Sequence, residues 1–310
     1  MELGGSDYLG QFALAVKLTA QGAGIRQLEL SDYLAQVPGD YFVRRREERK
    51  RPDQRRKFQL VQEGVGAPGF VVARIEAMDV DNKTRHVIER LQQSCGGGAA
   101  VERPLADAVW TLEGRPCENE AGFKLEILKD GEAFLTLHKT VRLHRRSAGG
   151  WNERFGDGLP FAVEVELRAE DHTRRLLSVA FTLRGPEGLV REDTRVEDRM
   201  AIGGFADPER RAELRNGDQA GKADKCEFPG GLDWAGMVNK YFALVAVADP
   251  RDPLTRFEKA RAYPAYSEGK ATIPGVLMSS YQVKFDEGSR AAVVGYRLFA
   301  GPKDLSLIHI

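Results

Sequence analysis

The strongest constraint on this chain is an alternation of apolar and polar residues with a period of two. In the run 161–169 every odd position is apolar, and positions 164, 166 and 168 are charged. Successive side chains of a strand point to opposite faces, so this run predicts a strand with one buried face and one face in water. Similar runs recur at 12–18, 177–183, 281–285 and 292–298. The chain is therefore predicted to be rich in β-strands.

Turn residues separate the predicted strands. Asp130-Gly131 lies between the alternating runs 123–128 and 133–137, and this dipeptide is the strongest short-range signal for a hairpin. Further turns are predicted at 21–24 and 286–289, between the first two and the last two strands, and at 185–188. Consecutive hairpins favour an antiparallel sandwich over a parallel sheet with crossover helices.

Helical patterns are few. Short helices are predicted at 85–93, where Gly96-Gly97-Gly98 would follow the end, and at 208–215 and 234–242. No repeat or composition break divides the chain, so residues 1–305 are predicted to form a single domain, with 306–310 as a tail. The expected fold class is mainly β: a large twisted antiparallel β-sandwich with a few short helices.

Length and charge exclude several classes of protein. A chain of 310 residues is long enough for a sizeable core. Its 46 Lys and Arg residues balance 46 Asp and Glu residues, which argues against nucleic-acid binding. No run approaches the ~20 apolar residues of a membrane-spanning helix, and the first residues lack a signal-peptide pattern. The chain is expected to be cytosolic or a soluble piece of a longer protein.

One segment departs from this balance. Residues 44–57 carry nine basic and three acidic side chains, whereas the remainder of the chain has a net charge of −6. Such a block is typical of a solvated loop, but it also suits contact with anionic lipid headgroups. The candidate interaction surface consists of Arg44, Arg45, Arg46, Arg49, Lys50 and Arg51.

Signatures of metal, cofactor or catalytic sites are scarce. The chain has no HExxH, GxSxG, P-loop or EF-hand motif. Cys95, Cys117 and Cys226 form no CxxC pair, so neither a zinc site nor a disulfide framework is predicted, although a Cys95–Cys117 bridge stays open. No cofactor and no metal are expected. The histidines are interpreted as ordinary strand or surface residues, and the tryptophans as core residues rather than sugar-stacking platforms.

Two stretches near the C-terminus resemble a known family. The segment 230–249 places a tryptophan before Lys240-Tyr241-Phe242 and a short apolar run, and 296–303 reads YRLFAGPK. Both are similar to elements of YidC-type membrane protein insertases, and 14–33 resembles the opening hairpin of their large periplasmic domain. The residues that carry the resemblance, interpreted as structural, are Trp234, Lys240, Tyr241, Phe242, Gly301, Pro302 and Lys303.

The resemblance implies a large β-sandwich, similar to the galactose-mutarotase-like sugar-binding fold, on the periplasmic side of the bacterial inner membrane. The domain would not be an enzyme. It would assist membrane protein insertion through contacts with SecF-like components of the Sec translocon and with membrane protein clients.

A second hypothesis keeps the fold and changes the function. The chain would then be a free-standing sugar-binding or mutarotase-like protein, in which a histidine and a carboxylate exchange protons with a sugar. The candidates are His138, His144 or His172 with Glu164 or Glu166. Two carboxylates on the outward face of a strand support acid–base chemistry only where the fold brings them together in a cleft.

Overall fold

The computed structural model describes residues 1–5, 11–34, 57–93, 100–145, 161–191, 197–205, 207, 209–249, 252 and 255–303. Residues 44–51 of the basic segment, Cys95, Trp151 and the tail 306–310 lie outside this range. The candidate surface of arginines and Lys50 therefore stays a prediction. The assignment of 1–305 to one domain is likewise a prediction.

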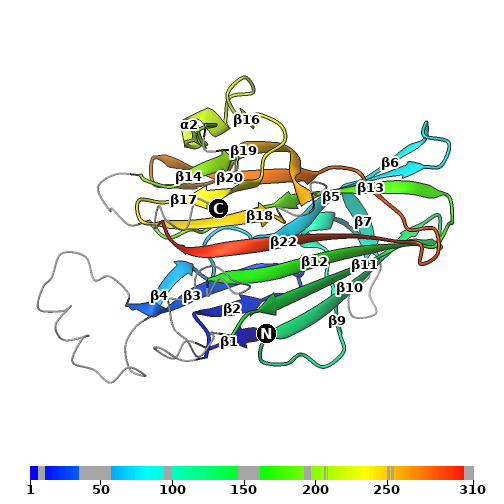
Figure 1. Ribbon diagram of the computed structural model, residues 1–310, viewed down its shortest axis with the longest axis horizontal. Coiled ribbons are helices and arrows are strands. Elements are labelled where there is room, and N and C mark those ends of the chain that lie inside the picture. Colours follow the sequence, from blue (N-terminus) through cyan, green and yellow to red (C-terminus); the bar gives the residue numbers. More distant parts are fainter. Residues whose placement is uncertain are drawn as a thin grey trace, which may run out of the picture.

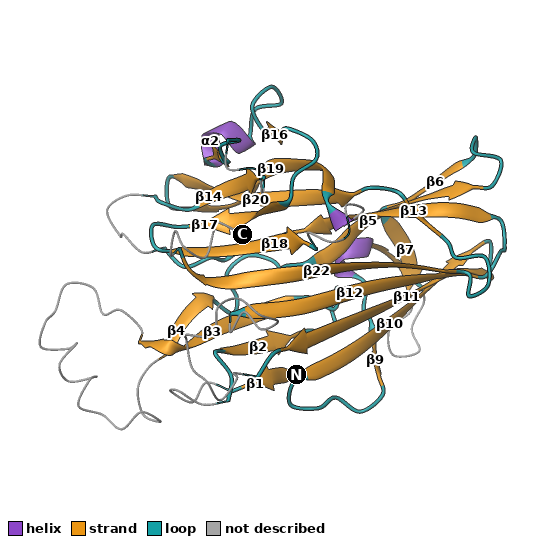
Figure 2. Cartoon of the chain, in the orientation of Figure 1, coloured by secondary structure: helices purple, strands orange, loops and turns teal. Residues whose placement is uncertain are grey.

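Strands dominate the described residues and pair into antiparallel sheets (Figures 1 and 2). Within that part of the chain the largest sheet has nine strands, in the order β15 (Glu213–Arg215), β14 (Met200–Gly204), β17 (Trp234–Val238), β18 (Phe242–Ala248), β22 (Ala291–Pro302), β12 (Ala162–Asp171), β11 (Glu132–Leu143), β10 (Glu120–Lys129) and β9 (Thr111–Glu113). In Figure 1, β22, β12, β11 and β10 run side by side along the molecule.

A second large sheet has the order β16 (Glu227–Phe228), β19 (Phe257–Glu268), β20 (Ala271–Ser280), β13 (Leu176–Arg184), β5 (Val71–Asp79) and β6 (Arg85–Ile88), with β21 (Val283–Lys284) paired to β13. Smaller sheets join β1 (Glu2–Gly4), β2 (Leu14–Leu18), β3 (Ile25–Leu34) and β4 (Lys57–Val61), and β7 (Arg90–Gln93) with β8 (Val101–Pro104). Two short helical segments are described, η2 (Leu105–Asp107) and α2 (Gly217–Ala220).

The alternating run at 161–169 forms β12 as predicted. Val163, Val165 and Leu167 are at most 4% exposed and belong to the main apolar cluster, whereas the charged residues between them face outward. Buried apolar side chains from the nine-stranded, seven-stranded and four-stranded sheets meet in one cluster. The nine-stranded sheet therefore packs one face against the core and leaves the charged face of β10, β11, β12 and β22 open, as expected for a sheet with this pattern.

The predicted hairpin at Asp130-Gly131 is confirmed. It connects β10 to β11, which pair from Glu120↔Arg142 to Lys129↔Glu132. Asp130 has a φ of 55° and Gly131 a φ of 83°. Positive φ at both central residues is the geometry of a tight turn that matches the twist of the strands.

All three predicted helices are wrong. Residues 85–93 form β6 and β7, 208–215 end in β15, and 234–242 contain β17 and the turn to β18. A turn precedes or interrupts each of the three predicted helices. Before the first of them, the Asp81 carboxylate accepts hydrogen bonds from the backbone N–H groups of Lys83 and Thr84, and the chain reverses there into β6. Pairing with a neighbouring strand then overrides the weak helical periodicity.

The last two predicted strands also differ from expectation. Only Val283 and Lys284 of the run 281–285 form a strand, and β21 pairs with β13 of the seven-stranded sheet. The following strand, β22, belongs to the nine-stranded sheet. The turn at 286–289 therefore passes the chain from one sheet to the other instead of closing a hairpin. No helix in the described residues is long and apolar enough to span a membrane.

Candidate functional site

Charged side chains form rows across the open face of the nine-stranded sheet. The register aligns Glu120 on β10 with Arg142 on β11, Arg142 with Glu164 on β12, and Glu164 with Arg297 on β22. Side chains directly opposite each other on antiparallel strands have Cβ atoms about 5 Å apart. Residues from four separate strands, up to 177 positions apart, are thereby brought into one row.

The row is held together by ion pairs. Arg142 Nε lies 2.7 Å from Glu120 Oε2, and Arg142 Nη1 lies 3.8 Å from Glu164 Oε2. The hydrogen bond to Glu120 raises the pKa of the Arg142 guanidinium. Glu164 Oε1 also contacts His144 Nε2 at 2.9 Å, where the chain leaves β11. The carboxylate of Glu164 therefore orients the imidazole of His144.

The next row contains a carboxylate without a partner. It runs from Thr140 on β11 to Glu166 on β12 and Gly295 on β22. Among the described residues, the Glu166 side chain accepts no hydrogen bond and forms no ion pair, and the guanidinium of Arg297 in the first row is equally unpaired. A Cβ built on Gly295 would meet no atom within 4 Å. The space beside Glu166 is therefore open.

These rows line a cavity of about 450 Å³. Its walls include Val247 and Val293, and Val293 is 48% exposed. The volume lies within the range of small-molecule sites, and the mixture of a few charged groups with apolar wall residues is typical of such sites. The charged residues of the wall are Glu120, Arg142, Glu164, Glu166, Asp249, Asp252 and Arg297.

The cavity offers two groups for proton transfer. Glu166 and Glu164 are two residues apart on β12, so their Cα atoms are separated by about 6.6 Å. Glu166 is an unpaired carboxylate that can accept a proton, and Glu164, which contacts His144, is a second carboxyl group in the cavity wall that can exchange one. The spacing leaves room between the two groups for the reacting end of a small polyol.

The other candidate histidines lie elsewhere. His138 Nδ1 is 2.9 Å from Glu113 Oε2, and its Nε2 is 3.6 Å from Glu170 Oε2, so both ring nitrogens face carboxylates. His172 Nε2 contacts Thr136 Oγ1 at 2.7 Å. Neither of these two histidines lines the cavity, and His144 meets it only through its contact with Glu164. Of the pairs considered from the sequence, the structure brings together His144 with Glu164, and Glu166 lies in the adjacent row.

The residues of the insertase-like segments lie in and around the β17–β18 hairpin and the end of β22. Phe242 is buried and its ring stacks on Phe58 with a centroid distance of 4.5 Å. Tyr241 is 47% exposed, and its carbonyl accepts a hydrogen bond from the N–H of Lys303. Lys240 lies over the Tyr241 ring.

Three further members of that set are in strands. Trp234 opens β17 and packs partly buried against the core, while Gly301 and Pro302 end β22, where Pro302 is paired with Phe242. None of the seven residues that carried the resemblance lines the cavity, although Val247, Asp249 and Arg297 of the same segments do. Trp110 is 2% exposed, as expected for a core tryptophan.

Sequence reasoning did not identify Arg297 and Gly295. A signal was available, because the alternation at 292–298 places both residues opposite the buried Val294, Tyr296 and Leu298. The alternation does not reveal the order of the strands in the sheet. β22 pairs with β12, which lies more than 120 residues earlier in the sequence. In the described residues no group of His, Cys, Asp or Glu has the arrangement of a metal site.

No family model and no curated protein sequence matches this chain. Solved structures do. A galactose mutarotase-like protein from Lactobacillus casei has a TM-score of 0.51 at 9% identity, over 97% of this chain and 99% of its own. A putative aldose 1-epimerase from Escherichia coli (TM-score 0.48, 9% identity, 97% and 98% covered) and a galactose mutarotase related enzyme from Lactobacillus acidophilus (0.47, 11%, 97% and 97%) are also similar.

The expected fold class is confirmed: the chain is mainly β, with the galactose mutarotase-like β-sandwich fold. The insertase assignment is wrong, and with it the assignment to protein transport and the prediction of a non-enzymatic protein. The structure from Lactobacillus casei that shares this fold is named as galactose mutarotase-like, and no family model, of an insertase or otherwise, matches the chain. The SecF-like and client contacts and the periplasmic location depended on that assignment and stay untested.

Proposed function

We propose that this chain binds an aldose on the open face of the nine-stranded sheet and accelerates the interconversion of its anomers. One observation carries the proposal: the unpaired carboxylate of Glu166 and the carboxylate of Glu164, which contacts His144, line the same cavity. The fold supports it, because a protein named as galactose mutarotase-like shares the architecture over nearly its whole length.

The reaction needs one base and one acid. Glu166 removes the proton from the hydroxyl on the anomeric carbon while the His144–Glu164 pair supplies a proton to the ring oxygen through the Glu164 carboxyl, which lines the cavity, and the bond between that carbon and the ring oxygen breaks. The open-chain aldehyde rotates about the adjacent carbon–carbon bond. The ring then closes on the other face of the carbonyl as the two protons return along the same paths.

Other residues of the cavity position the sugar. Arg297 has no protein partner among the described residues and presents several N–H donors to hydroxyl oxygens. Val293 and Val247 offer apolar surface to the C–H face of the ring. Arg142 is occupied by Glu120 and Glu164, so its contribution is to hold Glu164 in place.

Polarimetry with freshly dissolved aldoses such as α-galactose and α-glucose tests the proposal. The chain should accelerate the change in rotation for at least one of them. The variants Glu166→Gln and Glu164→Gln should each lose about 100-fold in rate, the usual contribution of a positioned acid or base. Glu126→Gln is the matched control, because Glu126 lies on β10 outside the cavity and pairs with Lys124.

Two results would overturn the proposal. The first is a wild-type chain that leaves the spontaneous rate unchanged for every aldose tried and shows no sugar binding by calorimetry. The second is a set of variants in which Glu166→Gln is as active as Glu126→Gln. Circular dichroism of each variant separates loss of function from loss of fold.

A further inference from the structure

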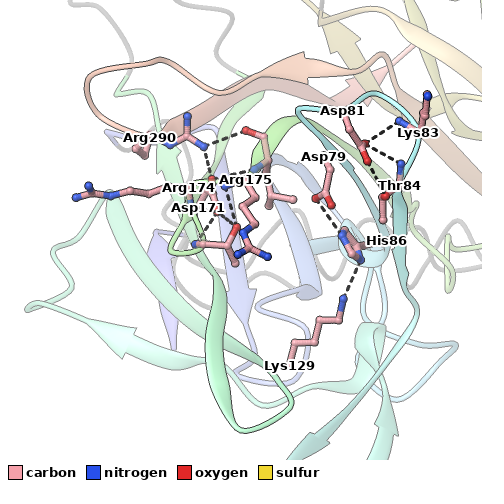
Figure 3. A network of polar contacts seen from close by, with 12 residues as sticks. Asp79, Asp81, Lys83, Thr84, His86, Lys129, Asp171, Arg174, Arg175 and Arg290 are labelled. Carbon is pink, nitrogen blue, oxygen red and sulfur yellow. Dashed lines mark hydrogen bonds and ion pairs between the residues drawn. The ribbon is translucent and has the colours of Figure 1, made fainter.

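Three ionisable side chains form a second cluster, at the end of the sandwich where β5, β6 and β10 finish or begin (Figure 3). Asp79 ends β5, His86 lies on β6, and Lys129 ends β10. His86 Nε2 lies 3.0 Å from Asp79 Oδ1, and His86 Nδ1 lies 3.0 Å from Lys129 Nζ. A line of contacts thus runs from carboxylate through imidazole to amine.

The contacts define the role of each group. An ammonium carries donors only, so Lys129 donates to Nδ1 and that nitrogen is the acceptor. The proton of the neutral imidazole then lies on Nε2, where it is donated to Asp79. A nucleophile hydrogen-bonded to a base that is itself oriented by a carboxylate is the arrangement that activates nucleophiles in covalent catalysis, and lysine amines are among those nucleophiles.

Neighbouring residues hold the His86 ring in place, whereas the Lys129 amine is accessible to solvent. The His86 side chain is 18% exposed, and its ring meets the Phe134 ring edge-on with a centroid distance of 5.2 Å. The turn at Asp81, whose carboxylate also contacts the Thr84 hydroxyl, leads directly into β6 and positions His86 (Figure 3). Lys129 is exposed and its Nζ lies 5.4 Å from the centre of the Phe134 ring.

We propose that Lys129 is a nucleophilic amine that accepts an acyl group from an activated acyl donor, such as an ester or thioester. The Lys129 ammonium first loses one proton to water, and His86 then acts as the base for the attacking nitrogen. The free amine attacks the carbonyl carbon, the carbon–nitrogen bond forms, and the bond to the alkoxide or thiolate leaving group breaks. A second proton leaves the nitrogen to give the amide, so two protons and one leaving-group anion are released for each acyl group bound.

This site is separate from the proposed sugar cavity. Glu120 lines the cavity at the start of β10 and Lys129 ends the same strand. Nine residues of extended chain span about 30 Å. Acylation of Lys129 can therefore be tested independently of the proposed sugar chemistry.

p-Nitrophenyl acetate is a suitable probe, with mass spectrometry of the digested chain to measure acetylation at each lysine. Lys270 is the internal reference, because it is exposed in the turn between β19 and β20 and forms no ion pair or hydrogen bond among the described residues. Lys129 should be acetylated at least ~10-fold faster than Lys270. His86→Gln and Asp79→Asn should reduce the Lys129 rate towards the Lys270 rate and leave Lys270 unchanged.

Equal rates at Lys129 and Lys270 in the wild-type chain would overturn the inference. It would also fail if His86→Gln left the acetylation rate of Lys129 unchanged, because the amine would then react without the help of His86. Circular dichroism and the unchanged Lys270 rate show whether each variant is folded. A second variant, His86→Phe, keeps a ring against Phe134 and removes the base, so it should behave as His86→Gln does.

Discussion

The ammonium of Lys139, which is 1% exposed, donates a hydrogen bond to the carbonyl oxygen of Phe70, a residue whose φ is 56°. A second hydrogen bond, 2.8 Å long, goes to the carbonyl of Ala23, whose φ is 46°. A left-handed backbone conformation is unfavourable by about 1–2 kcal/mol for any residue other than glycine. The buried Lys139 on β11 thus satisfies the carbonyls of two unfavourable bends, one before β3 and one before β5.

This arrangement predicts an unusual dependence of stability on pH. Burial lowers the pKa of Lys139 to about 7, whereas an unfolded lysine titrates near 10.4. Between these values the unfolded chain binds the additional proton, so the free energy of unfolding should rise with pH, by about 1 kcal/mol per unit. Urea unfolding from pH 7 to 10 measures the slope. The difference between wild type and Lys139→Met isolates it from other groups, and parallel profiles would contradict the prediction.

Asp171 should make the chain sensitive to acid. Its side chain is fully buried, and burial opposes its ionisation, but hydrogen bonds from Thr173, Arg290 and the Leu176 N–H outweigh that cost and lower its pKa (Figure 3). A lowered pKa in the folded state gives stability that is present above about pH 4 and is lost as the pH falls further. Asp171→Asn should lose about 3 kcal/mol at pH 7 because Arg290 loses its partner.

Urea unfolding at pH 7 and pH 3 checks this prediction. The loss caused by Asp171→Asn should shrink at pH 3, because there the Asp171 carboxyl of the unfolded wild-type chain is largely protonated and the folded state loses part of its advantage. Asp130→Asn is the matched control, because asparagine tolerates the positive φ of that turn position. The prediction is wrong if both substitutions cost the same.

Gly295 offers a test of the cavity that leaves its charged residues in place. Gly295→Val places a β-branched side chain on the open face beside Glu166, in space where no atom lies within 4 Å of the new Cβ. Valine suits a strand, so the thermal midpoint should be unchanged or slightly higher. Sugar binding measured by calorimetry should weaken at least ~10-fold, because the cavity is partly filled. Binding that survives intact would place the sugar elsewhere.

Gly204 and Trp234 form a tightly packed cross-strand pair. A Cβ on Gly204 would lie 2.1 Å from Cζ2 of the Trp234 ring. Gly204→Ala should therefore cost about 1–3 kcal/mol, as overpacked sites do. In the Trp234→Ala background the same substitution should cost much less, and a double-mutant cycle of unfolding free energies measures the coupling. Additive effects would mean that the ring moves aside freely.

The elements that the sequence predicted well depend on local rules. The run at 161–169 became β12 because alternating side chains can be divided between core and water only in an extended strand. Asp130-Gly131 became a hairpin turn because its two residues tolerate positive φ. The segment 234–242 failed because its weak helical pattern contains Asn239, whose carboxamide accepts hydrogen bonds from the Tyr241 and Phe242 N–H groups and turns the chain into β18.

The sequence alone also determined that Glu164 and Glu166 share the outward face of one strand, because that follows from the period of the backbone. Tertiary structure decided what those carboxylates meet. His144 comes from the end of the preceding strand in the sheet, and Arg297 and Gly295 come from a strand more than 120 residues away. Strand order and register arise from burial of the whole apolar cluster, which no local pattern encodes.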